Sequence, residues 1–369
     1  MKIGILKEDS NEYRVSITPN IVNNLVQKGF EVFFENDCGI KSNFSNLEYQ
    51  NAGGILSDKV IVYNCDIIIK INAPDLEELM LFKDKSILIC HMNSFDNQKL
   101  FDLLKTKKIQ AYALELIPRI SRAQSMDILS SQSNLVGYHS VIQASYLGGF
   151  VLPMMITSAG SIPPAKAFII GAGVAGLQAI ATAKRLGCIV SAYDVRADTK
   201  EQVESLGAKF ICVDSKENIS GVYAKQMSDD YKQKEREVLL NHISKQDIII
   251  TTALILGKKP PILIDEEMFQ VIKKGSVIVD LAVFSGGNCV FSQPNKIIEK
   301  NGIKIIGYNI INSIPSDASK LFAKNVFNFL SPHIKDSGIL DINYDDEIII
   351  GSLLSKDGVI VNKFFIEGN

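Results

Sequence analysis

The sequence predicts an α/β protein made of two doubly wound, Rossmann-like domains with a cleft between them. Short apolar runs alternate with segments of helical spacing along most of the chain, as parallel strands joined by crossover helices require. A glycine-rich turn, Gly171-x-Gly173-x-x-Gly176, joins one apolar run to a helix. The 369 residues are too many for one ordinary core, so two domains are expected.

The second half of the chain carries the clearer alternation. A buried strand over 167–170 precedes the glycine turn, and a helix with recurring apolar residues follows it until Gly187. Further strands are expected at 189–194, 209–213, 247–252, 276–283 and 303–308, with helices near 200–206, 228–244 and 265–273. Six strands joined by such crossovers form a complete doubly wound parallel sheet.

The first half repeats this pattern without the glycine turn. Its strands are expected at 2–6, 31–35, 66–71, 86–91 and 110–114. About 60 residues follow Tyr308, too few for an independent α/β domain, and they contain a helix over 318–330 and a hairpin over 347–362. We therefore expect the chain to return to its first domain. That gives a discontinuous domain of residues 1–130 plus 310–369 and a nucleotide-binding domain of residues 131–309.

The composition is that of a globular enzyme. A net charge of -2 offers no basic face, so no nucleic-acid partner is expected. The six cysteines form no CxxC pair, and the histidines have no ligand-like spacing, so we expect buried free thiols and no metal site. The amino-terminal apolar stretch is too short for a secretory signal.

The segment from Ile128 to Ala165 contains no Asp, Glu, Lys or Arg. Its serines, glutamines, glycines and proline leave no continuous run of about 20 apolar residues, the length that a membrane-crossing helix needs. We expect no membrane span here, and a helix buried between the two domains instead.

The glycine turn has the context of a dinucleotide site. Gly171 permits the tight turn, and Gly173 lets the backbone approach a pyrophosphate at the amino terminus of the following helix. That helix begins at Val174, and Gly176 lets it pack closely against the strand. These residues predict a bound NAD(H).

Two charged residues after the next strand bear on the choice of cofactor. Asp194 lies 18 residues beyond Gly176, where a carboxylate accepts hydrogen bonds from the adenosine ribose and repels a 2′-phosphate. Arg196 points the other way, because a nearby arginine accommodates a 2′-phosphate. The aspartate stands at the strand end itself, so we expect NAD(H) rather than NADP(H).

The stretch Pro118–Ser131 is unusually polar for its surroundings. It places Arg119, Arg122, Gln124 and Asp127 between two apolar flanks, ahead of the glycine turn. A core segment would not need so many long polar side chains. We interpret the stretch as a loop that grips a polar ligand beside the dinucleotide site. A charged linker between the domains is the alternative.

With these motifs, the chain resembles the NAD(H)-binding alpha subunit (domain I) of proton-translocating NAD(P) transhydrogenase, in the alanine dehydrogenase/transhydrogenase family. The match covers nearly the whole chain, and its strongest pieces are 119–127, 179–187 and 199–207. The resemblance implies a homodimer that docks on a membrane-embedded partner subunit with an NADP(H)-binding domain, at the cytoplasmic or matrix-like face of the inner membrane. It also implies direct hydride transfer from NADH to NADP⁺, coupled to proton flow through that partner and active only with it.

The resemblance further implies roles for single residues. Arg119, Asp127 and Ser130 would hold the nicotinamide end of the cofactor. Gln124 would lie near the nicotinamide ribose and the second nucleotide, so Gln124 and Asp127 are the expected catalytic residues. Tyr223 would lie on a mobile loop that closes over bound NAD(H).

Arg122 and Leu254 complete the expected cofactor-binding set.

Hydride transfer between two nicotinamides moves no proton to or from a substrate, so no general acid or base is required. A polar clamp without an acid–base pair suits that reaction.

An alanine dehydrogenase is the alternative interpretation, because Arg14, Lys70 and His91 match three of its substrate-site residue types. The fourth is missing, since alanine dehydrogenases carry an aspartate where this chain has Phe284. Oxidative deamination needs proton transfers, so this loss argues against the activity. A catalytically silent NAD-binding regulator is a third interpretation. Besides Phe284, the chain departs from the transhydrogenase pattern at Val222, where a glycine is usual, and over 309–316.

Overall fold

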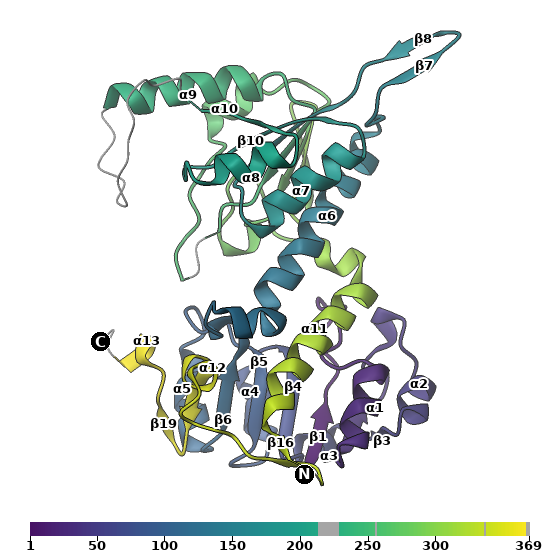
Figure 1. The fold of residues 1–369 in the computed structure, drawn as a ribbon, viewed down its shortest axis with the longest axis vertical. Helices are drawn as coiled ribbons and strands as arrows, with labels where there is room; N and C mark the ends of the chain where they lie inside the picture. The colour runs from purple at the N-terminus through teal and green to yellow at the C-terminus, as the bar shows by residue number, and fades with distance from the viewer. Residues whose placement is uncertain (213–228, 255–256, 336, 367–369) are drawn as a thin grey trace. The chain divides into compact units, whose positions relative to one another are not determined.

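The computed structural model describes residues 1–212, 229–254, 257–335 and 337–366 of the chain. These residues form two compact units (Figure 1). The first unit combines Met1–Gln132 with Ile311–Asn369, and the second is Ser133–Ile310. Each unit is a sheet covered by helices, so the predicted α/β class with two Rossmann-like sheets is confirmed.

The first unit is built on an eight-stranded sheet. Six parallel strands lie in the order β3-β2-β1-β4-β5-β6, and an antiparallel hairpin of β18 and β19 extends the sheet beyond β6. Both faces are covered by apolar clusters, which is why the central strand β4 starts with three consecutive buried isoleucines, Ile67 to Ile69, that point alternately to the two faces. The strands are β1 Lys2–Ile5, β2 Glu31–Glu35, β3 Ile55–Ser57, β4 Ile67–Asn72, β5 Ile87–His91, β6 Gln110–Ala113, β18 Leu353–Lys356 and β19 Val359–Ile360.

The second unit is built on a seven-stranded sheet in the order β11-β10-β9-β12-β13-β15-β14. Its first six strands are parallel, and β14 adds an antiparallel edge. The order reverses between β9 and β12, which makes their carboxyl ends the expected position of a ligand. The strands are β9 Lys166–Ile170, β10 Ile189–Tyr193, β11 Lys209–Phe210, β12 Ile248–Thr251, β13 Val277–Asp280, β14 Ile297–Lys300 and β15 Ile303–Ile306.

The helices pack on the faces of the two sheets (Figure 1). Those of the first unit are α1 Pro19–Gln27, α2 Asn46–Asn51, α3 Lys59–Tyr63, α4 Leu76–Leu81, α5 Lys99–Thr106, α11 Pro315–Leu330, α12 Glu347–Ser352 and α13 Lys363–Ile366. Those of the second are α7 Val174–Arg185, α8 Thr199–Ser205, α9 Asp229–Ile243 and α10 Glu266–Val271, while α6, Ile128–Gly148, begins in the first unit and continues into the second. None of the described helices combines the length and the apolar character that crossing a membrane requires.

Several local predictions differ from the structure. The expected hairpin over 347–362 begins as the helix α12, because Asp346 caps it by accepting a hydrogen bond from the amide of Ile348 at 2.8 Å. Only β18 and β19 form the hairpin. The antiparallel strand β14 was not predicted, because its two isoleucines are followed at once by Glu299 and Lys300, which leaves too short an apolar run at a largely exposed sheet edge.

The charge-free segment also differs from the prediction of one buried helix. Helix α6 ends at Gly148, and residues beyond it form an exposed two-stranded hairpin of β7, Met155–Thr157, and β8, Gly160–Ile162. Not all thiols are buried either: the six cysteines are free, and Cys212 is exposed.

Candidate functional site

The glycine turn follows β9 directly and is shaped by close contacts. Gly171 has a φ of +104°, and a β-carbon there would lie 2.4 Å from the hydroxyl oxygen of Thr252. A β-carbon on Gly176 would lie 1.9 Å from the carbonyl oxygen of Gly171, so only glycine allows the helix to approach the turn. Among the described residues, nothing lies within 4 Å of the corresponding position on Gly173, which leaves its backbone open to a ligand.

The turn leads into the amino terminus of α7. Gly173 is the N-cap in an extended conformation, and it has no side chain to cap the helix. The amides of the first turn therefore have no side-chain partner at the cap, and the helix dipole adds partial positive charge. Lys184 and Arg185 lie at the other end, where they complement the dipole. Val174, the first helical residue, is 42% exposed, so this end of the helix is accessible to a phosphate.

Asp194 follows β10 and is joined to the glycine turn. Its Oδ2 accepts a hydrogen bond from the amide of Ala172 at 2.7 Å. Arg196 donates to both carboxylate oxygens, from Nε and Nη2, each at 2.9 Å. Burial opposes ionisation of this carboxyl, but the hydrogen bonds from Arg196 and Ala172 outweigh it and hold the pKa of Asp194 below its ordinary value. Asp194 is therefore an anion held at the edge of the turn.

The first unit has the same kind of contact between a carboxylate and a backbone amide, but without a glycine turn. Glu35 ends β2, and its Oε2 accepts a hydrogen bond from the amide of Lys7, just after β1, at 2.8 Å. A carboxylate on a neighbouring amide is thus a feature of both sheets. The second unit differs in the glycine turn beside Asp194, which the first unit lacks.

Two residues after β12 complete the edge of the glycine turn. The Thr252 hydroxyl donates to the carbonyl oxygen of Gly171 at 3.0 Å, and Leu254 is 57% exposed. Thr252 was missed by the sequence reasoning, although a hydroxyl residue directly after an apolar strand was a usable signal. Tyr223, with Val222 beside it, lies outside the described residues.

The polar stretch of the first unit is more regular than the predicted loop. Residues Ser121–Met126 form a 3₁₀ helix, and α6 starts two residues later. Asp127 caps α6, since its two oxygens accept hydrogen bonds from the amide of Ser130 at 2.9 Å and from its hydroxyl at 2.6 Å. Arg119 and Gln124 are exposed. Arg119, Gln124, Asp127 and Ser130 thus lie close together in the chain at the start of α6, and we call them the polar surface of this segment.

Arg122 and Ser125, which belong to the same 3₁₀ helix, have partners elsewhere in the first unit. Arg122 donates from Nη1 and Nη2 to the two carboxylate oxygens of Asp346, each at 2.7 Å, so its guanidinium is already paired within the unit. Asn325 and Asn328 of α11 both donate to the carbonyl oxygen of Ser125, at 2.8 and 2.9 Å, and so fix the 3₁₀ helix. No local pattern in the sequence pointed to these long-range supports.

The predicted site residues thus fall into two groups. Gly171, Gly173, Val174, Gly176, Asp194, Arg196 and Leu254 lie at the carboxyl edge of the second sheet. Arg119, Arg122, Gln124, Asp127 and Ser130 belong to the first unit.

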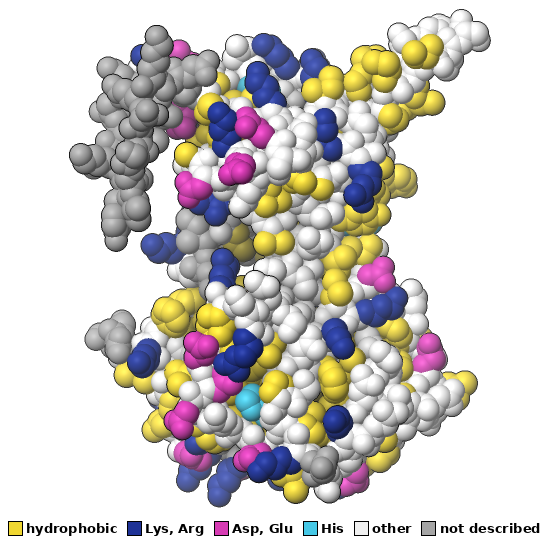
Figure 2. Space-filling view, viewed as in Figure 1, with side chains coloured by type: hydrophobic (Ala, Val, Ile, Leu, Met, Phe, Trp, Pro, Cys, Tyr) yellow, Lys and Arg dark blue, Asp and Glu magenta, His cyan; other side chains and the backbone are white. Residues whose placement is uncertain are grey.

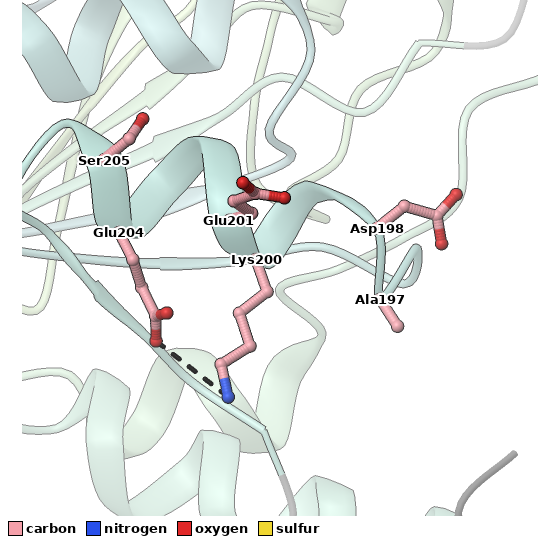
Figure 3. A pocket seen from close by; sticks show the side chains of 6 residues that line it. All are labelled: Ala197, Asp198, Lys200, Glu201, Glu204 and Ser205. Atoms are coloured by element: carbon pink, nitrogen blue, oxygen red, sulfur yellow. Dashed lines mark ion pairs between the residues drawn. The ribbon is translucent and has the colours of Figure 1, made fainter.

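A surface hollow follows Arg196 in the sequence (Figure 3). Its rim carries a loose ion pair between Lys200 and Glu204, at 4.0 Å, and both side chains are about half exposed. Such a pair, four residues apart on a short helix, is typical of a solvated surface. The hollow is lined by Ala197, Asp198, Lys200, Glu201, Glu204 and Ser205. We assign it no role in the site.

Two family models together cover most of the chain. Residues 4–136 match the model described as "Alanine dehydrogenase/PNT, N-terminal domain", and residues 140–363 match "Alanine dehydrogenase/PNT, C-terminal domain". The chain belongs to the alanine dehydrogenase/PNT family.

Relatives in this family include transhydrogenases and alanine dehydrogenases. An NAD(P) transhydrogenase alpha-subunit protein of Rhodospirillum rubrum is 48% identical over 376 residues, with 98% of each chain covered. The crystal structure of transhydrogenase from Sinorhizobium meliloti superimposes with a TM-score of 0.90 at 41% identity, covering 98% of this chain and 100% of that one. Alanine dehydrogenase of Staphylococcus haemolyticus is 31% identical over 317 residues, 85% of this chain and 79% of that one. The predicted family resemblance is confirmed.

Two of the three residues that suggested an alanine dehydrogenase, Arg14 and Lys70, have partners within the protein. Arg14 donates from Nε and Nη2 to the carboxylate of Glu12, at 2.8 and 2.7 Å. Lys70 is 3% exposed, and its Nζ lies 3.1 Å from Glu78 Oε2. Burial lowers the pKa of His91, which favours the neutral imidazole. Both cations are thus neutralised within the first unit.

Phe284 lies on the loop that follows β13. It sits in a one-turn 3₁₀ helix, Val283–Ser285, and is 54% exposed. An exposed phenyl ring has no proton to give or accept. This loop therefore presents an apolar side chain at the position where an alanine dehydrogenase is expected to carry an aspartate.

Proposed function

We propose that this chain is the NAD(H)-binding component of a proton-translocating NAD(P) transhydrogenase. When bound, the nicotinamide of NADH supplies the hydride, which passes directly to NADP⁺ held on a partner subunit. Proton translocation is the task of a membrane-embedded partner, on whose cytoplasmic or matrix-like face this chain docks. The chain's own residues bind and orient one dinucleotide and exclude water from it.

The glycine turn joined to Asp194 is the observation that carries the NAD(H) assignment. The open backbone at Gly173 and the uncapped end of α7 fit a pyrophosphate. Asp194 is an anion at the turn, and its charge disfavours a 2′-phosphate. Arg196 does not reverse this preference, because its guanidinium is committed to Asp194.

The polar surface at the start of α6 supports positioning rather than acid–base chemistry. Asp127 is engaged by both the amide and the hydroxyl of Ser130, so its carboxylate acts as a helix cap. Arg119 and Gln124 are exposed and available to a ligand. We propose that Arg119, Asp127 and Ser130 hold the nicotinamide end and that Gln124 orients it toward the second nucleotide.

Two observations speak against alanine dehydrogenase activity. Phe284 supplies no carboxylate, and oxidative deamination needs groups that move protons at nitrogen and oxygen. Arg14 and Lys70 are each paired with a carboxylate of the same unit. A substrate carboxylate would have to compete with those partners.

A homodimer is supported by the β7–β8 hairpin. It projects from its own sheet (Figure 1), and apolar side chains gather along it (Figure 2). Ile156 is 80% exposed, and Met154, Met155 and Ile162 are each at least 43% exposed. An isolated two-stranded hairpin is marginally stable in water at best. We propose that a second copy of the chain covers this hairpin.

Reconstitution tests the proposal. The purified chain is mixed with membranes that carry the remaining transhydrogenase subunits of Rhodospirillum rubrum, and reduction of an NADP⁺ analogue by NADH is followed. Transfer that requires both components supports the proposal. NADH binding without transfer in any such mixture favours a silent regulator, and NADH formation from alanine by the chain alone favours an alanine dehydrogenase.

A further inference from the structure

A fully buried asparagine holds the segment that borders the glycine turn. We propose that Asn288 is a positioning residue for the NAD(H) site, because it fixes Ala253 and hence Thr252 and Leu254 beside the turn. Asn288 is itself 0% exposed, so it acts through these residues and not by touching the cofactor. The inference rests on the proposed function, since it concerns the affinity of the same dinucleotide site.

The side chain of Asn288 uses its hydrogen-bonding capacity on two segments. Its Oδ1 accepts from the amide of Ala253 at 3.1 Å, and its Nδ2 donates to the carbonyl oxygen of the same residue at 2.9 Å. The second proton of Nδ2 is donated to the carbonyl oxygen of Pro261 at 2.8 Å. The Asn288 side chain thus satisfies both the amide and the carbonyl oxygen of Ala253, which lies just beyond the end of β12 and outside its strand pairing.

The residue before Ala253 touches the glycine turn. The amide of Thr252 donates to the carbonyl oxygen of Ile170 at 2.9 Å, and its hydroxyl donates to that of Gly171 at 3.0 Å. A shift of Ala253 would therefore move the hydroxyl that sits 3.3 Å from the position of a β-carbon on Gly176. Asn288 is thus linked to the glycine turn through Ala253 and the adjacent Thr252.

Asp280 fixes Asn288 from behind. This carboxylate ends β13 and is 2% exposed. Its Oδ2 accepts from the amides of Asn288 and Cys289, at 2.8 and 2.9 Å, and its Oδ1 accepts from the amide of Ala282 at 3.0 Å. A buried carboxylate with three amide donors is well compensated and rigid. Asp280 and Asn288 therefore brace two neighbouring loops at the carboxyl edge of the sheet.

The test compares NADH affinity in two variants of the full chain. Asn288→Ala should raise the NADH dissociation constant about 10- to 100-fold, the loss found when residues that orient the ligands of a metal site are replaced. Thr252→Val keeps the side-chain shape and removes one neutral hydrogen bond, so a rise of about three- to tenfold is expected. Both are measured by NADH fluorescence below the melting temperature of each variant.

Two matched controls separate positioning from general loss of stability. Asn362→Ala removes a buried asparagine of the first unit whose Nδ2 also bridges two carbonyl oxygens, those of Gly351 and Leu353, at 2.8 and 3.2 Å. Thr182→Val removes a hydroxyl that donates to the carbonyl oxygen of Gln178 within α7, at 2.8 Å. Both controls should lower the melting temperature while NADH affinity stays at the wild-type value.

The outcomes are distinct. Unchanged NADH affinity in folded Asn288→Ala overturns the inference, as does an equal loss of affinity in Asn362→Ala. If Asn288→Ala does not fold, the comparison of Thr252→Val with Thr182→Val decides in the same way. Failure of the wild-type chain to bind NADH would reject the proposed function itself, whereas wild-type binding with unchanged variants rejects only the role of Asn288.

Discussion

Replacing Asp194 with alanine should weaken NADH binding and strengthen NADPH binding through two different contacts. The carboxylate is the proposed acceptor for the adenosine ribose, and loss of a charge-assisted hydrogen bond costs about 1–3 kcal/mol. That corresponds to a rise of about 5- to 150-fold in the NADH dissociation constant. The ion pair with Arg196 contributes at most about 1 kcal/mol to folding, because the arginine side chain is 58% exposed. The free energy of NADH binding should therefore fall by at least as much as the loss of that ion pair lowers the free energy of unfolding.

The gain for NADPH comes from Arg196. In the wild-type chain its Nε and Nη2 both donate to Asp194. Without the carboxylate, the guanidinium is free to pair with a 2′-phosphate, and the repulsion of that phosphate is gone. The double variant Asp194→Ala/Arg196→Ala should keep the loss of NADH affinity and cancel the gain for NADPH.

Fluorescence titration with both nucleotides measures these changes. Asp194→Asn is a useful second variant, because its amide oxygen still accepts from Ala172 while the charge is removed. Glu35→Ala is the matched control, since Glu35 makes the same contact with an amide in the first sheet, at 2.8 Å from Lys7. Equal wild-type affinity for NADH and NADPH would refute the reasoning, and so would a fall in NADH affinity in Glu35→Ala as large as in Asp194→Ala.

Three further predictions concern other residues. With Phe284 in place, the chain should form no NADH from alanine at alkaline pH, and turnover of even about 1 per second would contradict this. Gln124→Asn should leave NADH affinity nearly unchanged and slow hydride transfer in the reconstituted complex about a hundredfold, whereas Arg119→Ala should weaken NADH binding itself. Stopped-flow transfer beside equilibrium titration checks both variants, and parallel loss of binding in the two would reject a separate role for Gln124. Burial raises the pKa of Glu8 from its ordinary 4.5 to about 7, so its contribution to stability is fully present below pH 4.5 and is lost as the pH rises through 7. Glu8→Gln should remove up to about 3 kcal/mol of this pH dependence in urea unfolding at pH 5 and 8, and an unchanged dependence would show that Glu8 does not titrate in that range.

The sequence by itself determined the features that depend on local order along the chain. Strands such as β2 and β6 begin where the apolar runs predict, because an apolar run long enough for a strand and too short for a helix has few alternatives. The strand, glycine turn and helix around Gly171 are contiguous in sequence, so their geometry could be read from it. The family resemblance was also present in short contiguous segments.

Only the tertiary structure decided which polar groups meet. Arg122 stood in the predicted clamp, yet its partner Asp346 lies 224 residues away. No local pattern in the sequence marks Asn288 as a supporting residue, but its side chain lies against Ala253 because β12 and β13 are neighbours. Local periodicity specifies which face of an element is buried, whereas the pairing of distant segments specifies which buried donors and acceptors satisfy one another.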